Sequence, residues 1–100
     1  MEHVEECVES AKHKEKNNSG KHPCPCCGCL TYPVVPAKEA GFICPVCFWE
    51  NDLYIKNEEE PSDANKGLTL KEAKRNYLDW GASDLKLKKY VRKPLPDEIP

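Results

Sequence analysis

Residues 24–29 read CPCCGC, a run that places four cysteines within six positions. Cys24 and Cys27 form one Cys-x₂-Cys pair, and the later CPVC stretch supplies a second pair, Cys44 and Cys47. The complete spacing, C-x₂-C-x₁₆-C-x₂-C, is typical of a four-cysteine zinc site. Two intervening residues let the backbone curl so that both sulfurs of a pair converge on one tetrahedral ion. The motif therefore predicts a metal centre around which the chain folds.

The residues inside each pair support this turn geometry. Pro25 and Pro45 follow the first cysteine of each pair and fix φ there. Gly28 follows the first pair, where it permits a positive φ that a Cβ would oppose. Four thiolates suit Zn²⁺, and iron in a rubredoxin-like site remains the alternative metal. Two disulfides fit less well because we expect a reducing compartment. A thioredoxin-like redox pair fits less well because the chain lacks a strand–helix–strand pattern.

Composition indicates why such a chain needs a metal. Only 39% of its 100 residues are hydrophobic and 32% are charged, so packing alone supplies a thin core. The polar start MEHVEECVES is unlike a signal peptide, and no apolar run approaches the length of a membrane span. We therefore expect a cytoplasmic protein whose cysteines stay reduced and available to a metal.

Several cysteines and histidines fall outside the predicted ligand set. Cys26 lies inside the first turn and is interpreted as a small buried residue, with a reactive thiol as the alternative. Cys29 could replace Cys27 in a shifted Cys26–Cys29 pair, but the proline and glycine favour the register that starts at Cys24. Three weaker candidates for metal ligands are Cys7, His3 and His22.

The pattern of residues divides the chain into two parts. Residues 1–21 predict an amphipathic helix over 2–16 and a linker, and residues 22–98 predict the cysteine-rich domain. Within the domain, 30–35 and 41–43 have strand composition, with a connecting loop at 36–40. Residues 56–68 are polar and predict a surface loop.

Thr69-Leu70-Lys71-Glu72 is a capping-box pattern that predicts the start of a second helix, which Gly81 would end. Ser83-Asp84 predicts the cap of a short third helix, on which Leu87, Tyr90 and Val91 would face inward. The proline-rich tail 94–100 predicts an extended segment. The fold expected is α+β: a small zinc-ribbon-like domain with two CPxC knuckles on short hairpins, a packed C-terminal helix and the extra N-terminal helix. Its main core would consist of aromatic residues: Phe42, Phe48, Trp49, Tyr77 and Trp80.

Four stretches of the chain carry a family resemblance: CPCCG, ICPVCFWEND, NKGLTLKEAKRNYLDWGASD and KKYVRKPLPDE. On these residues the chain resembles the bacterial cysteine-rich CPCC family over about Cys24 to Glu98. It departs from the family pattern at Cys29, Asn51, Trp80 and Ser83, and at Lys66, which separates the Asn and Gly of the family motif. The resemblance implies a small metal-binding domain with the same ligand register, and no reaction. Because relatives often carry cysteine at the position of Ser83, it also implies that Ser83 lies near the cysteine cluster.

The predicted function follows from the predicted site. Four protein thiolates leave no open coordination position, and no catalytic triad or phosphate loop is present, so we expect no enzyme. A binding module for a protein partner is the first hypothesis, with an antitoxin, immunity or other regulatory role as one form of it. Acidic residues at Glu50, Asp52 and 58–63 would meet a basic partner. One alternative is nucleic-acid binding through the basic cluster of Lys86, Lys88, Lys89, Arg92 and Lys93. The other is thiol redox chemistry through Cys26. The net charge of −2 argues against a nucleic-acid binder.

Overall fold

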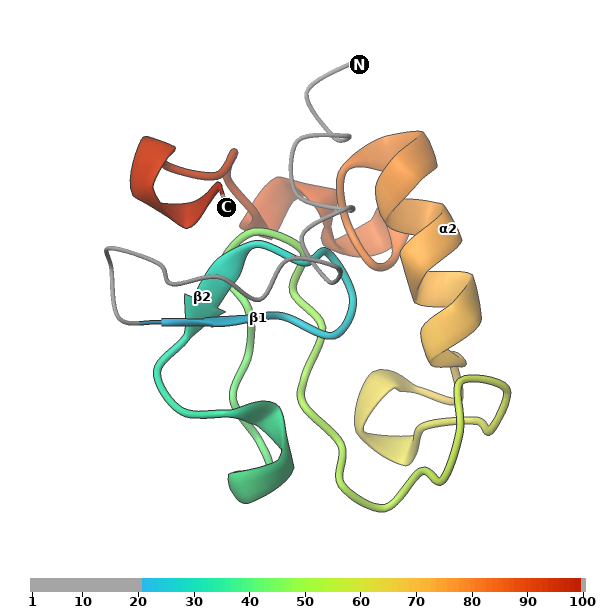
Figure 1. The fold of residues 1–100 in the computed structure, drawn as a ribbon. Helices are drawn as coiled ribbons and strands as arrows, with labels where there is room; N and C mark the ends of the chain where they lie inside the picture. Colours follow the sequence, from blue (N-terminus) through green and yellow to red (C-terminus); the bar gives the residue numbers. More distant parts are fainter. Residues whose placement is uncertain (1–20, 100) are drawn as a thin grey trace.

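The first cysteine pair lies at the tip of a short antiparallel hairpin. The computed structural model describes residues 21–99, so the predicted N-terminal helix and its candidates Cys7 and His3 lie outside the described residues. Strand β1 (His22–Pro23) pairs with strand β2 (Leu30–Tyr32), with His22 opposite Tyr32 and Pro23 opposite Leu30 (Figure 1). The strand predicted over 30–35 ends early because Pro33 has no N–H to donate to a ladder.

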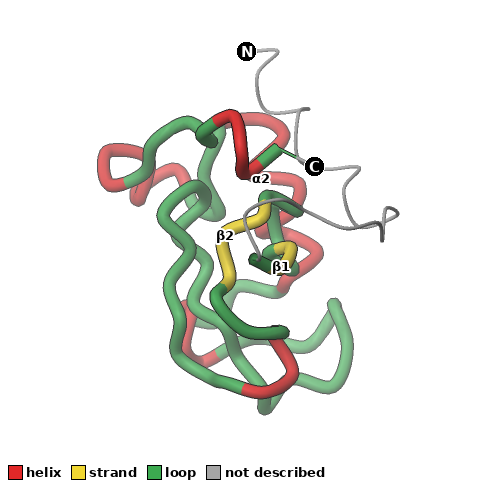
Figure 2. The backbone as a smooth tube through the Cα atoms, turned by 60° about the vertical axis from the view of Figure 1, so that its left-hand side comes forward, coloured by secondary structure: helices red, strands yellow, loops and turns green. Residues whose placement is uncertain are grey.

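The second cysteine pair lies on a shorter hairpin. The prediction of a strand over 41–43 was wrong, since only an isolated bridge joins Ile43 to Glu50. Asn51 extends this pairing through backbone bonds with Gly41 (2.9 Å) and Phe42 (2.8 Å). Its buried side-chain amide also donates to two carbonyls of the connecting loop, which includes a 3₁₀ turn at Pro36–Lys38. The two hairpins therefore reach the centre of the molecule with little regular strand, and most of the described chain is loop (Figure 2).

Helix α2 (Leu70–Trp80) confirms the capping prediction. The Thr69 hydroxyl accepts from the Glu72 amide and the Glu72 carboxylate accepts from the Thr69 amide, both at 3.0 Å. Gly81 ends the helix in the left-handed conformation with φ of 84°, and its N–H bonds to the Tyr77 carbonyl. The buried face of α2 consists of Ala73 and Tyr77, which pack on the cysteines.

After α2 the chain turns back along the helix. Asp84 caps a 3₁₀ helix at Leu85–Tyr90, as predicted, but Tyr90 is 58% exposed and does not face inward. The tail is not extended as predicted, because it forms a further 3₁₀ turn at Pro96–Glu98 that buries Glu98. Figure 1 shows Leu85–Tyr90, in orange-red, beside α2, and Pro96–Glu98, in red, on the side of β2.

Cysteines are the most frequent residues in the core of the described part of the chain, and the aromatic residues Trp49, Tyr32 and Tyr77 are its largest buried side chains. Six of the eleven residues in the buried cluster are cysteines, and Trp49 and Tyr77 are the predicted aromatic residues that join them. Phe42 and Phe48 are only partly buried, and Trp80 is 37% exposed at the end of α2, so its assignment to the core was wrong. The described part of the chain holds no helix long and apolar enough to cross a membrane.

Candidate metal centre

The first knuckle folds through contacts within six residues. The Gly28 N–H bonds to the Cys24 carbonyl at 2.9 Å, and the Cys24 N–H bonds to the Cys29 carbonyl at 2.9 Å. The Cys26 N–H points at the Cys24 sulfur from 3.4 Å. Gly28 has φ of 81°, which is the conformation that the glycine permits without strain.

The second knuckle repeats the first one bond for bond. Phe48 N–H bonds to the Cys44 carbonyl (2.8 Å), Cys44 N–H to the Trp49 carbonyl (3.1 Å), and Val46 N–H approaches the Cys44 sulfur (3.4 Å). Phe48 occupies the position equivalent to Gly28 and has φ of 70° despite its side chain. For a residue with a Cβ this left-handed conformation costs about 1–2 kcal/mol. The hydrogen bonds of the knuckle therefore outweigh the preference of phenylalanine for a negative φ.

The two knuckles bring the four predicted ligands together. The sulfurs of Cys24, Cys27, Cys44 and Cys47 all lie within 4.8 Å of one another, and all four residues are buried. The distance is 3.6 Å between the sulfurs of Cys24 and Cys47, and 3.8 Å between those of Cys27 and Cys44. A tetrahedron with metal–sulfur bonds of about 2.3 Å has edges of about 3.8 Å. The cluster therefore has the size that a tetrahedral ion requires.

The electrostatics of the sulfurs also fit a cation. Burial raises the pKa of Cys27 and of Cys47 well above the ordinary thiol value. Burial also opposes ionisation of Cys44, but hydrogen bonds from the other sulfurs and from Thr31 outweigh it and lower the pKa of Cys44 well below the usual range. The buried cluster thus favours negative charge at Cys44 and disfavours it at Cys27 and Cys47. A divalent cation would offset that cost and allow all four thiolates.

A second layer of polar groups surrounds the sulfurs. The Thr31 hydroxyl lies 3.2 Å from the Cys44 sulfur. The hydroxyls of Tyr32 and Tyr77 are buried without a hydrogen-bond partner among the described residues. Burial and the negative charge of the nearby cysteines raise the pKa of both tyrosines. Both hydroxyls therefore stay protonated beside the cysteines.

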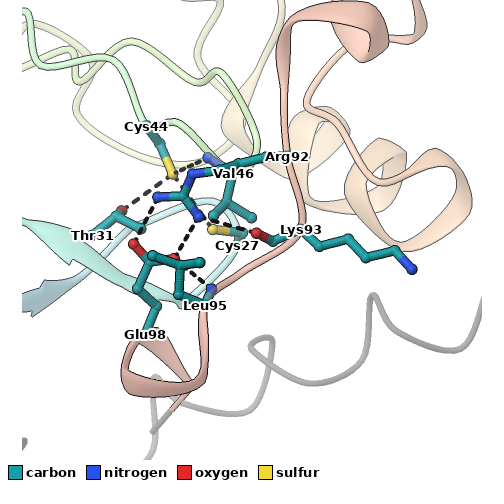
Figure 3. Close-up of polar contacts among 8 residues, drawn as sticks. All are labelled: Cys27, Thr31, Cys44, Val46, Arg92, Lys93, Leu95 and Glu98. Atoms are coloured by element: carbon teal, nitrogen blue, oxygen red, sulfur yellow. Dashed lines mark hydrogen bonds and ion pairs between the residues drawn. The ribbon is translucent and has the colours of Figure 1, made fainter.

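The C-terminal segment is bound to the second knuckle through Arg92, and we call the Arg92–Glu98 ion pair with this contact the Arg92–Glu98 strap. The Arg92 backbone N–H bonds to the Pro45 carbonyl at 3.2 Å, and its guanidinium makes two bonds of 2.8 Å to the Glu98 carboxylate. Glu98, only 5% exposed, also accepts from the Leu95 N–H. Figure 3 shows this pair beside Cys44 and Thr31. Sequence reasoning missed Thr31 and the Arg92–Glu98 pair, because neither belongs to a local metal-binding pattern.

The remaining sequence candidates do not join the cluster. Cys26 is 4% exposed, and burial raises the pKa of its thiol, which matches its interpretation as a packing residue. Cys29 is fully buried outside the group of four sulfurs and is disulfide-bonded, so the expectation that the cysteines stay reduced does not hold for it. His22 lies in β1 and is likewise outside that group. Ser83 is buried against the second knuckle, where its N–H bonds to the Cys47 carbonyl at 2.8 Å, as the family resemblance implied.

The acidic surface predicted to meet a basic partner is largely engaged within the chain. Glu58 and Glu59 form ion pairs with Lys74 and Lys71 of α2. Asp52 accepts from the Ser62 hydroxyl at 2.6 Å and from the Tyr54 N–H at 2.8 Å. Glu58 and Glu59 thus link the loop over 56–68 to α2 through exposed ion pairs, and Asp52 bonds to Ser62 of the same loop.

Comparison with known proteins gives one match. A sequence profile of the family described as Cysteine-rich CPCC matches residues 22–98. The match includes both knuckles, α2 and the Arg92–Glu98 strap. No curated protein and no solved structure matches the chain.

Proposed function

The chain belongs to the cysteine-rich CPCC family, and from this premise we propose that it is a small cytoplasmic zinc-binding protein that acts as a binding module for a protein partner. The observation that carries the proposal is the closed cluster of four buried sulfurs at tetrahedral spacing. Four protein ligands satisfy a tetrahedral Zn²⁺ and leave no position for water or substrate.

A structural role for the ion is supported by the composition of the core. Because cysteines dominate the buried cluster, removing the ion would leave their sulfurs without the bonds that join the two hairpins. Structural zinc contributes about 10–16 kcal/mol in small zinc-binding peptides. This is comparable to the whole stability of an ordinary domain, about 5–15 kcal/mol. The ion would therefore decide whether the chain folds, and the surface would carry the function.

The metal content tests the first half of the proposal. We expect one zinc per chain, measured by elemental analysis of protein purified without added metal. We also expect retention of that zinc in Cys26→Ala and its loss in Cys44→Ser. Iron in place of zinc, with the visible absorption of an iron–thiolate centre, would support the rubredoxin-like alternative. Loss of metal from Cys26→Ala would contradict the ligand assignment.

Capture from the native host tests the second half. The full chain with an affinity tag should retain a protein partner after nuclease treatment, and the Cys44→Ser chain should not. Capture that disappears on nuclease treatment would favour the nucleic-acid alternative. Capture that depends on a thiol at position 26 would favour the redox alternative.

A further inference from the structure

The segment that follows α2 carries a concentrated positive charge. Between Leu85 and Pro94 it contains five basic residues and no acidic one, in a chain whose net charge is −2. The five are Lys86, Lys88, Lys89, Arg92 and Lys93. Such a local excess on an overall acidic protein marks a surface with its own electrostatic preference.

This charge is not neutralised in the way the acidic loop is. Of the five, only Arg92 has an acidic partner among the described residues, namely Glu98. The Lys88 ammonium donates to the Trp80 carbonyl at 2.7 Å, and the Lys89 ammonium lies 5.4 Å from the Tyr90 ring centroid. The four lysines therefore keep their charge available at the surface.

A cavity of about 200 Å³ lies between this segment and the end of α2. Its apolar walls include Trp80, Val91 and Pro94, and its charged lining residues, Lys88, Arg92 and Lys93, are all cationic. Figure 1 shows α2 beside the 3₁₀ helix at Leu85–Tyr90. We call this cavity and its rim the basic groove.

The walls of the basic groove are held in place. Gly81 ends α2 with a left-handed turn, and the Asn76 side chain donates to the Ser83 carbonyl at 2.9 Å across the connection. The Arg92 strap fixes the opposite wall on the second knuckle. A preformed groove loses less entropy on binding than a mobile surface does.

We propose that the basic groove binds an acidic segment of the protein partner and takes one apolar side chain of that segment between Trp80, Val91 and Pro94. The inference rests on the proposed binding function and names the surface and the chemistry of the partner. Charge complementarity selects the acidic segment, because every charged group on the rim is positive. The partly exposed Trp80 supplies the kind of aromatic contact that anchors protein interfaces.

The dimensions of the groove favour a peptide side chain over other occupants. Pockets for small molecules usually measure about 300–1,000 Å³, and this one is smaller. A nucleic-acid strand would need a longer cationic track with several stacking rings, whereas of the two aromatic residues in the groove lining Tyr77 is 1% exposed and only Trp80 is accessible.

The test is selection from a display library of random linear peptides against the zinc-loaded full chain at ~0.15 M salt. We expect enrichment of peptides that place Asp or Glu beside an apolar residue. The double variant Lys88→Glu/Lys93→Glu should weaken their binding at least about tenfold, because like charges would then face each other. Fluorescence anisotropy with the selected peptides measures this change, and metal content and circular dichroism verify that the variant is folded.

The matched control is Lys38→Glu/Lys56→Glu, which makes the same change in net charge at exposed lysines outside the groove. It should leave peptide affinity within about twofold, since these lysines do not line the groove and salt screens exposed charges. Enrichment of basic or uncharged peptides, or an equal loss in both double variants, would overturn the proposal. Tighter binding of an oligothymidylate probe that Lys88→Glu/Lys93→Glu abolishes would also overturn it, in favour of nucleic acid. If the groove variant leaves capture of the native partner intact, this inference fails while the proposed function stands.

Discussion

The Arg92–Glu98 strap offers a sharp test of how the C-terminal segment stabilises the metal centre. Arg92→Gln would leave the Glu98 carboxylate, whose side chain is 6% exposed, with only the Leu95 N–H as a partner. Breaking a buried ion pair costs about 3–5 kcal/mol, and an exposed pair is worth about 0–1 kcal/mol. Because the Arg92 side chain is 41% exposed, water compensates in part, and we expect a loss of about 2 kcal/mol.

Glu98→Gln should cost less, about 1 kcal/mol, because a neutral amide still accepts one bond from Arg92 and leaves no buried charge. Combining both changes in a double-mutant cycle should therefore show a coupling of at least about 1 kcal/mol. The assay is urea unfolding at a fixed free zinc concentration, followed by tryptophan fluorescence, to which Trp49, 1% exposed, and Trp80 both contribute. A loss of 2 kcal/mol corresponds to a fall of about 8–16 °C in the melting temperature of a domain this size.

The pH dependence of this contribution has a defined sign. The hydrogen bonds from Arg92 lower the pKa of Glu98, against the opposing effect of burial. A carboxyl group with a lowered pKa stabilises the fold above its unfolded pKa, about 4.3, and loses that contribution as the pH falls through the folded value. The difference between wild type and Glu98→Gln should therefore be constant from pH 8 to about pH 5.

Arg75→Gln is the matched control, because Arg75 pairs with Asp79 on the exposed side of α2 at 3.4 Å. Its removal should cost less than about 0.5 kcal/mol. A loss below 0.5 kcal/mol for Arg92→Gln as well, or a coupling near zero, would show that the tail detaches without cost and that the strap is not part of the cooperative fold.

Three further predictions concern the sulfur cluster. Cys44→Ser should lose the metal and the cooperative unfolding transition, whereas Cys26→Ala should keep one zinc per chain. Native mass spectrometry measures the zinc content of both variants. A zinc-loaded form of Cys44→Ser would contradict the ligand assignment. Cys26 in the zinc-loaded protein should react with iodoacetamide more slowly than an ordinary exposed thiol at pH 7, because burial raises its pKa; labelling at or above the rate of free cysteine would revive the redox hypothesis. Thr31→Val should keep the zinc but release it to a chelator faster, because the Cys44 sulfur loses the hydroxyl at 3.2 Å. The zinc affinity should be about 10–100-fold lower. An unchanged release rate would show that the hydroxyl does not support the metal centre.

The features that sequence reasoning predicted correctly depend on short-range geometry. The four sulfurs meet because each Cys-Pro-x-Cys turn is specified by its own residues, and α2 begins at Thr69 and ends at Gly81 because both caps act within one turn. The position of Ser83 followed from a substitution pattern in the family and not from the chain itself.

The features that sequence reasoning missed depend on contacts between distant segments. Trp80 has the spacing of a core residue on α2, but the helix contributes Ala73 and Tyr77 to the buried cluster, and Trp80 lies in the wall of the basic groove. Glu98 reads as part of a solvated tail, and it is buried because Arg92 has been carried to the second knuckle. Phe48 gave no local signal for a left-handed conformation, since that conformation belongs to the knuckle and not to the residue.

The independence of the two knuckles has a consequence for the order of events in folding. Each knuckle closes its hydrogen bonds within about one turn of chain, so either can form before the other. Joining them through one ion closes the 16-residue segment between Cys27 and Cys44. A loop of about ten residues closes in about 10–100 ns, which is fast compared with bimolecular capture of a scarce ion. The half-site that first captures zinc therefore holds it as a two-sulfur intermediate for only a brief time, and the refolding rate of the apo-protein should rise in proportion to the free zinc concentration.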